Sequence, residues 1–359
     1  MILLGDKDDK KNKQTVFVPY YSCGLKTQRD SWCYNSSLDS LNFNMEQATA
    51  FYNKQRELLT LGKIQDVIYD STRISWTTNV LNAAKKNEII PLDKIGENSN
   101  CLYRPYFKQY GCYSRFWNER VYQLPKLFPT SKYKNLVICV SGVGVTKDFS
   151  CIITDMLPDL ELIGNSQCFP LYWYEENKNK QQTLSLFDTE SSDDYIRRDG
   201  ITDWILKEVR TRFGNARKIT KETIFYYVYG LLHSPKYREA FAADLKKSLP
   251  RIPIVEDIDA FLDFSYAGKQ LANLHLNYEE IPAYEGVTVI GDRQKEEAPD
   301  GRMIAGTTDL YAVKVDYKYY EVEKMRFPKK GQKDTIIYNS SIRIENIPDE
   351  AYELSLIHI

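Results

Sequence analysis

The strongest chemical signal in the sequence is a basic and aromatic segment at residues 103–134. It carries seven basic residues against one acidic residue, Glu119, and ten of its 32 residues are aromatic. Cations neutralise nucleic-acid phosphates and flat rings stack on bases, so this composition is typical of a nucleic-acid surface. A solvated strand face above an aromatic core would have the same composition, and the segment alone leaves both interpretations open.

A second basic run lies at residues 317–333. It has six basic residues against Glu321 and Glu323, which gives a local charge of +4. Its stretch Phe327-Pro-Lys-Lys-Gly331 has the composition of a hairpin tip, where cations reach a phosphate backbone easily. An ordinary polar turn is the alternative interpretation.

The third candidate is the short polar stretch Lys26-Thr-Gln-Arg-Asp30. A glutamine amide can pair with adenine through two hydrogen bonds, and an arginine guanidinium can pair with guanine in the same way. Short polar stretches of this kind also form plain turns. The sequence therefore indicates base recognition here only in combination with other evidence.

Patterns typical of enzymes are incomplete. Ser141-Gly-Val-Gly-Val145 lacks the third glycine and the lysine of a phosphate-binding loop, and the chain has no Asn/Asp-Pro-Pro-Tyr tetrapeptide of an amino-methyltransferase. Asp300, Asp316 and Lys318 form a loose pattern that could hold Mg²⁺, although Pro299-Asp300-Gly301 also reads as a simple turn. We predict no catalytic residue and no metal ligand.

The elements that must position these groups indicate an α+β fold. Apolar residues at helical spacing predict helices over residues 39–61 and 80–86 and within residues 200–276. Short apolar runs predict strands at residues 16–21, 136–140, 150–154 and 169–174. We therefore expect a mixed β-rich region, a helical subdomain, and a β-rich C-terminal part at residues 286–347.

Charge and composition limit the class of protein. The chain has 359 residues, 48 basic and 49 acidic, and a formal net charge of −1. This balance excludes a uniformly basic nucleic-acid-binding protein but allows separate basic patches. No window of about 18 apolar residues suggests a membrane span. None of the seven cysteines has the two-residue spacing of a metal or redox motif, so we expect reduced thiols in a cytoplasmic protein.

Several stretches resemble the C-terminal specificity region of Type ISP single-polypeptide restriction–modification enzymes. The longest is the helical signature from Tyr226 to Pro253, which contains Tyr-Gly-Leu-Leu-His-Ser-Pro-Lys-Tyr-Arg. The others, in the family order, are Gly24-Leu-Lys-Thr-Gln-Arg-Asp-Ser-Trp32, Tyr103-Arg-Pro-Tyr-Phe-Lys108, Ser166-Gln-Cys-Phe-Pro-Leu-Tyr172, Val322-Glu-Lys-Met-Arg-Phe327, Thr335-Ile-Ile-Tyr-Asn339 and Ile347-Pro-Asp-Glu-Ala351. The resemblance covers nearly the whole chain.

The resemblance implies a module that recognises a target sequence in double-stranded DNA. Members of this family carry a nuclease, a translocating ATPase, an adenine-N6 methyltransferase and a target-recognition domain on one chain. Only the last of these, with a connector from the methyltransferase, resembles the present sequence. S-adenosylmethionine, ATP and Mg²⁺ are therefore expected for the parent enzyme and not for this fragment, whose partners would be DNA and the methyltransferase and helicase domains of the parent chain.

The resemblance also suggests domain limits. We expect a partial connector at residues 1–97 and a target-recognition region at residues 98–353, with a linker at 175–194, a helical part at 200–276 and a β-rich part at 286–347. The last six residues, Leu354–Ile359, match a transposon adapter end read in frame. We expect these six residues to be an artefact of sequence assembly.

Charge and loop placement select the expected DNA contacts. They are Lys26, Arg29, Arg104, Lys108, Arg115, Arg120, Arg326, Lys329 and Lys330. Two other classes remain open at this point: an active methyltransferase or nuclease fragment, and a protein-interaction module whose aromatic surface docks another domain.

Overall fold

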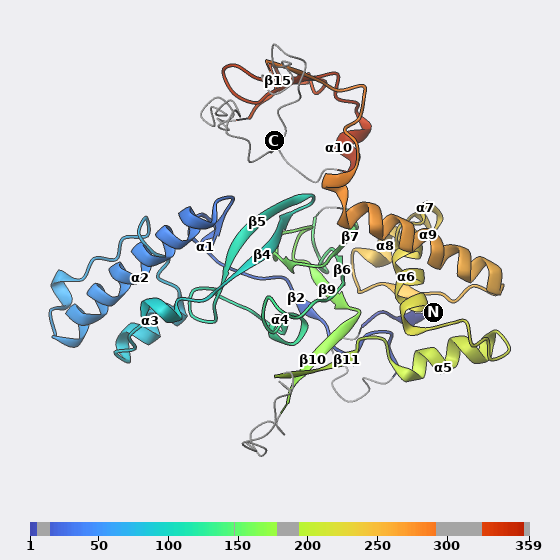
Figure 1. Ribbon diagram of the computed structural model, residues 1–359, viewed down its shortest axis with the longest axis horizontal. Helices are drawn as coiled ribbons and strands as arrows, with labels where there is room; N and C mark the ends of the chain where they lie inside the picture. The colour runs from blue at the N-terminus through green and yellow to red at the C-terminus, as the bar shows by residue number, and fades with distance from the viewer. Residues whose placement is uncertain (6–14, 147, 178–193, 292–324, 355–359) are drawn as a thin grey trace, which may run out of the picture. The chain divides into compact units, whose positions relative to one another are not determined.

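The computed structural model describes residues 1–5, 15–146, 148–177, 194–291 and 325–354. The chain forms two compact units, Met1–Tyr278 and Glu279–Ile359 (Figure 1). The helices of the first unit are α1 Asp30–Cys33, α2 Leu38–Thr60, η1 Ile64–Asp66, α3 Thr78–Lys85, η2 Leu92–Lys94, α4 Leu124–Leu127, α5 Asp203–Arg212, α6 Lys221–Leu232, α7 Pro235–Ala240, α8 Ala242–Leu245 and α9 Ile258–Leu276. Its strands are β1 Ile2–Leu3, β2 Ser22–Cys23, β3 Tyr34–Asn35, β4 Glu97–Arg104, β5 Phe107–Tyr113, β6 Val137–Val140, β7 Cys151–Thr154, β8 Leu157–Pro158, β9 Gln167–Pro170, β10 Tyr172–Glu176, β11 Tyr195–Asp199 and β12 Arg251–Ile252.

The centre of the first unit is an antiparallel sheet in the order β2-β9-β6-β7. Every residue of β6 and β7 is buried, as expected for the continuous apolar runs that predict these strands. Its core continues into helices α5, α6 and α9, which lie together on one side of the sheet in Figure 1. Burial of apolar surface between sheet and helices is the main stabilising term of this layer.

Helices α6 and α9 pack with unusually close backbones. A Cβ atom added to Gly268 would lie 2.0 Å from the Tyr226 carbonyl oxygen, and one added to Gly230 would lie 2.3 Å from the Phe264 carbonyl oxygen. The ring of Tyr227 stacks on that of Phe261 at 4.1 Å between centroids. Only glycine permits this approach, so the two glycines set the distance between the helices.

A second sheet has the order β3-β5-β4-β8, with β4 and β8 parallel and the other pairs antiparallel. Helices α1, α2 and α3 cover it and form a separate core with it around Leu41, Met45 and Tyr52. The N-terminus of α2 is capped by Ser37, whose hydroxyl accepts a hydrogen bond from the Ser40 amide. This sheet matters for function because strand β4 ends at Arg104, beside the polar loop of residues 24–30.

Two strand predictions differ from the structure. Residues 16–21 are not a strand, although Val16, Phe17 and Val18 are buried. The amides of Phe17 and Val18 donate to the carbonyls of Leu3 and Leu4, and the carbonyls of Val16 and Phe17 accept from Thr202. Residues 169–174 are divided between β9 and β10, because the chain leaves the central sheet at Leu171 and forms a hairpin with β11. Apolar content predicts burial in both places but not which strand is the partner.

Two predicted domain limits fall within elements of the first unit. The expected limit between residues 97 and 98 lies inside strand β4, Glu97–Arg104. Glu175 and Glu176, expected in a linker, are the last residues of β10, and residues 178–193 lie outside the described part of the chain.

The second unit contains a small antiparallel sheet in the order β13-β15-β14. Its strands are Thr288–Ile290, Arg343–Glu345 and Ile336–Ile337, and helix α10 spans Glu350–Leu354; a 3-10 turn, η4, spans Tyr278–Glu280 at the limit between the units. The loose carboxylate pattern at Asp300 and Asp316 lies outside the described residues. The mixture of separate helical layers and small sheets confirms the α+β prediction. Among the described residues, no helix has the length and apolar character needed to cross a membrane.

Candidate nucleic-acid interface

The polar loop of residues 24–30 is held by backbone pairing on both sides. The Leu25 amide donates to the Pro158 carbonyl at 2.8 Å, and the Leu25 carbonyl accepts from the Leu160 amide at 2.9 Å. Lys26 and Arg120 form an antiparallel bridge with N–O distances of 3.0 and 3.1 Å. A Cβ atom on Gly24 would lie 2.3 Å from the Asp159 carbonyl oxygen, so glycine is required where the loop passes this turn.

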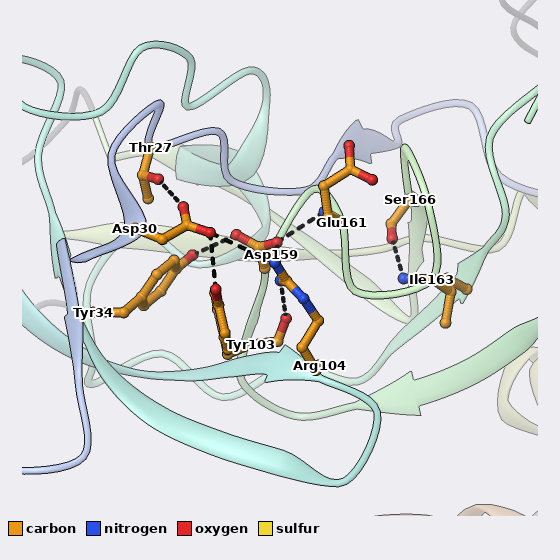
Figure 2. A network of polar contacts seen from close by, with 9 residues as sticks. All are labelled: Thr27, Asp30, Tyr34, Tyr103, Arg104, Asp159, Glu161, Ile163 and Ser166. Atoms are coloured by element: carbon orange, nitrogen blue, oxygen red, sulfur yellow. Dashed lines mark hydrogen bonds and ion pairs between the residues drawn. The ribbon is translucent and has the colours of Figure 1, made fainter. Parts of the chain in front are cut away.

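A partly buried polar network fixes the far end of the loop (Figure 2). Arg104 at the end of β4 donates to Asp159 at 2.7 Å and lies 3.5 Å from the carboxylate of Asp30. Asp159 also accepts hydrogen bonds from the Tyr34 hydroxyl at 3.0 Å and from the Glu161 amide at 2.8 Å. One guanidinium thus joins two carboxylates that lie far apart in the sequence.

Asp30 connects this network to the loop itself. It accepts hydrogen bonds from the Tyr103 hydroxyl, at 2.9 Å, and from the Thr27 hydroxyl. The turn after Asp159 is closed in addition by the Ile163 amide, which donates to the Ser166 hydroxyl at 3.1 Å (Figure 2). Satisfied buried networks of this kind hold a single conformation, because each broken contact leaves a polar group without a partner.

Burial dominates the electrostatics of the network. It raises the pKa of Asp159 from 3.8 to about 6, while the nearby Arg104 guanidinium and the Glu161 amide favour the ionised form. Burial also raises the pKa of Tyr103 to about 12 and that of Tyr34 well above 10. Both phenols are therefore neutral near pH 7 and able to donate their hydrogen bonds to the two carboxylates.

The predicted contact residues of the first unit occupy two kinds of environment. Arg115 and Arg120 are exposed, and Lys26, Arg29, Arg104 and Lys108 are half-buried. Arg104 is used inside the network, and the Lys108 ammonium lies 4.8 Å from the centroid of the Tyr278 ring. The structure brings Lys26 beside Arg120, so two cations from segments that are distant in sequence share one surface.

The basic turn of the second unit, residues 326–333, is exposed as predicted. Arg326 pairs with Ile337 across the turn through N–O distances of 3.2 and 2.9 Å, and Gly331 has a left-handed φ of 86°. The side chains of Arg326, Lys329 and Lys330 are all exposed. An exposed basic turn of this form fits both a hairpin tip that contacts a phosphate backbone and an ordinary polar turn.

Sequence reasoning did not identify the network residues Tyr34, Tyr103 and Asp159. The only local signal is that Leu157-Pro-Asp-Leu160 places an acid in an apolar run, where it would need a partner. That partner, Arg104, is separated from it by 55 residues, and no spacing rule connects them. The glutamine of the polar stretch is recognisable as a possible adenine reader, but its left-handed backbone, with φ 66°, and its exposed side chain have no signal in the sequence.

Neither the cysteines nor other donors form an evident metal site. All seven cysteines are free thiols, and every one except Cys23 is buried. Within the described ranges, no group of three or more His, Cys, Asp or Glu side chains is placed to hold a metal ion.

Comparison with known proteins gives a consistent result. The sequence profile of the Type ISP C-terminal specificity domain matches residues 16–356. The chain is similar to the structure of the ATP-dependent Type ISP restriction-modification enzyme LlaBIII bound to DNA, with 33% identity and a TM-score of 0.75 over 99% of this chain and 20% of that one. A search of curated proteins gives no match.

Two further solved structures are similar. One is a nuclease-deletion mutant of the Type ISP enzyme LlaGI in complex with a DNA substrate mimic, with 29% identity and a TM-score of 0.71 over 98% of this chain and 24% of that one. The other is the DrdV–DNA complex, with 26% identity and a TM-score of 0.73 over 97% of this chain and 31% of that one. The chain thus spans less than a third of the length of each of these proteins.

Proposed function

Because this chain belongs to the family of Type ISP C-terminal specificity domains, we propose that it recognises a specific sequence in double-stranded DNA. In a longer restriction–modification enzyme it would direct adenine-N6 methylation and cleavage by other domains. The observation that carries the proposal is similarity over 99% of the chain to a Type ISP enzyme bound to DNA. The geometry of the loop and the placement of the cations support it independently.

Phosphate contact and base reading are assigned to different residues of the surface. Exposed cations such as Arg115 and Arg120, and those of the basic turn, suit phosphate contacts, which position a duplex without reading it. Base reading needs side chains held in a fixed register, and the anchored loop of residues 24–30 provides such a frame. Arg104 is best assigned to the frame, because both of its neighbouring carboxylates depend on it.

Cofactor chemistry is assigned to the remainder of a longer enzyme. We propose that S-adenosylmethionine, ATP and Mg²⁺ act in methyltransferase, ATPase and nuclease domains that this chain would contact. The residues described here do not fit these groups: they form no carboxylate or histidine cluster for a metal, and the Gly142–Gly144 turn lacks the lysine of a phosphate-binding loop. The free thiols agree with a cytoplasmic location.

Selection of bound duplexes from a random pool, combined with affinity measurements from low to high salt, tests the proposal. We expect an enriched sequence and an affinity that falls by about 0.9 log units per log unit of salt for each phosphate contact. The absence of an enriched sequence would contradict specific recognition. Flat salt dependence would favour a protein-docking module, and methyl transfer or cleavage by this chain alone would favour an enzyme.

A further inference from the structure

Gln28 differs from its neighbours in the polar loop of residues 24–30 because it is the residue that is exposed. Thr27 is buried and bonded to Asp30, and Asp30 is bonded to Tyr103 and Arg104. Arg29 is half-buried, and its Nε is shielded from solvent. The Gln28 amide is exposed and makes no hydrogen bond with the described residues.

The backbone of Gln28 is also strained. Its φ of 66° lies in the left-handed region, which residues other than glycine and asparagine adopt at a cost of about 1–2 kcal/mol. The strain persists because both flanks are fixed, by the Lys26–Arg120 bridge on one side and by the Asp30 network on the other. The surrounding structure therefore presents one amide to solvent on a rigid support.

We propose that Gln28 is a specificity-determining residue that reads the edge of an A·T base pair in the major groove. The inference rests on the proposed function and assigns one base-reading position within it. A carboxamide carries a donor and an acceptor side by side, which matches the N7 acceptor and N6 donor of adenine. Lys26 is two residues away and Arg120 lies across the bridge from it, so both cations are placed to hold phosphates that flank that base pair.

Two substitutions of Gln28 in the full chain separate the role of its amide from that of its backbone conformation. A third substitution, at another exposed glutamine, is a control. Gln28→Gly keeps the left-handed φ without strain and removes only the side chain. Gln28→Glu keeps the shape and replaces the amide donor by an acceptor, which matches the N4 donor of cytosine. Gln65→Glu, at an exposed residue of η1 at the end of α2, is the control for the added charge.

Each variant would be taken through selection from a random duplex pool and through binding to the wild-type consensus and its single-base variants. We expect Gln28→Gly to lose preference at one A·T position by about 5- to 150-fold while binding to random duplexes is unchanged. Gln28→Glu should shift the preference at that position towards C·G, and Gln65→Glu should select the wild-type sequence.

Two results would overturn the inference. One is that both Gln28 variants select the wild-type sequence with undiminished discrimination. The other is that Gln28→Gly loses affinity equally for all duplexes, which would make Gln28 a backbone contact that carries no sequence information. A wild-type chain that selects no sequence at all would instead reject the proposed function, so the two failures can be told apart.

Discussion

At the residue scale, the decisive group is Arg104, which joins the carboxylates of Asp30 and Asp159 behind the polar loop. Its charge and position in the basic segment predict a phosphate contact, and in the structure its guanidinium pairs with both carboxylates while its side chain stays 30% exposed. A phosphate contact and a structural ion pair cannot be told apart in the sequence, because the acids that pair with this arginine lie in other segments. Exposed Arg115 and Arg120 carry the same local signal and remain candidates for DNA contact.

The first prediction concerns removal of this arginine. Arg104→Ala leaves Asp159 buried without its counter-charge, so we expect the free energy of unfolding to fall by about 3–5 kcal/mol and DNA affinity to fall as the loop loses its support. Chemical denaturation followed by circular dichroism measures the first effect. Arg115→Ala, at an exposed arginine, is the control and should change stability by less than about 0.5 kcal/mol. Equal stabilities of the two variants would contradict the structural role of Arg104.

A second prediction follows from the pKa of Asp159, which is raised from 3.8 to about 6 in the folded protein. The folded state binds more protons than the unfolded state between these values, so this residue makes the free energy of unfolding decrease as pH rises from about 4 to about 6. The full effect is on the order of 3 kcal/mol. Asp159→Asn should remove this contribution, whereas Asp155→Asn, at an exposed acid, should keep the wild-type pH profile. Superimposable profiles for wild type and Asp159→Asn would reject this account.

At the element scale, elements with strong periodicity or continuous apolar runs are predictable. Helices α2 and α3 and strands β6 and β7 lie within one or two residues of their predicted limits. Helix α7 begins with Ser234 as its N-cap and Pro235 at its first position, as that dipeptide predicts. The predictions are wrong where pairing decides the outcome, since burial of residues 16–18 is encoded locally but their strand partner is not.

The burial of helix α6 is another feature that apolar periodicity predicts only in part. The apolar stripe in its sequence, through Ile224, Tyr227, Val228, Leu231 and Leu232, predicts one buried face, whereas residues on all sides of the helix are buried. Helix α9 approaches through Gly230 and Gly268, and the residues outside the stripe, Phe225, Tyr226 and Tyr229, are aromatic and are buried as well. Such close approach is a property of two helices together and has no signal in either one.

This packing gives a third prediction. Alanine normally stabilises a helix by about 1 kcal/mol relative to glycine. Gly268→Ala should instead lower the free energy of unfolding by about 2 kcal/mol or more, because the new methyl group meets the Tyr226 carbonyl oxygen at 2.0 Å. Thermal and urea unfolding measure the change, with exposed Gln270→Ala of the same helix as the control. An increase in stability for Gly268→Ala would show that the helices are not in contact at this point.

At the scale of the whole molecule, the net charge of −1 conceals separate basic surfaces in two compact units. Residues 103–134 belong to the first unit, and the exposed basic turn of residues 326–333 belongs to the second. The sequence predicts both basic runs and the family resemblance, which the profile match confirms. The two units divide between Tyr278 and Glu279, in the interval between the expected helical part at 200–276 and the expected β-rich part at 286–347.

A fourth prediction tests whether both units contribute to DNA binding. Combined Arg326→Ala, Lys329→Ala and Lys330→Ala should weaken binding to all duplexes alike and reduce the slope of log affinity against log salt by up to about 2.7. The consensus selected from a random pool should not change, because phosphate contacts carry no sequence information directly. The control removes three exposed lysines of the first unit, Lys54, Lys63 and Lys86. A slope equal to that of wild type would exclude the basic turn from the interface.

The support of the loop by Gly24, Asp30 and Asp159 has a consequence for evolution. The residues that maintain the loop depend on one another, since a change in any one disturbs the contacts of the others. Position 28 can change without loss of a buried contact. If Gln28 reads a base as proposed, a new target preference needs mutation of only a single codon. Selection for folding and selection for target choice would act on different residues of the same short loop.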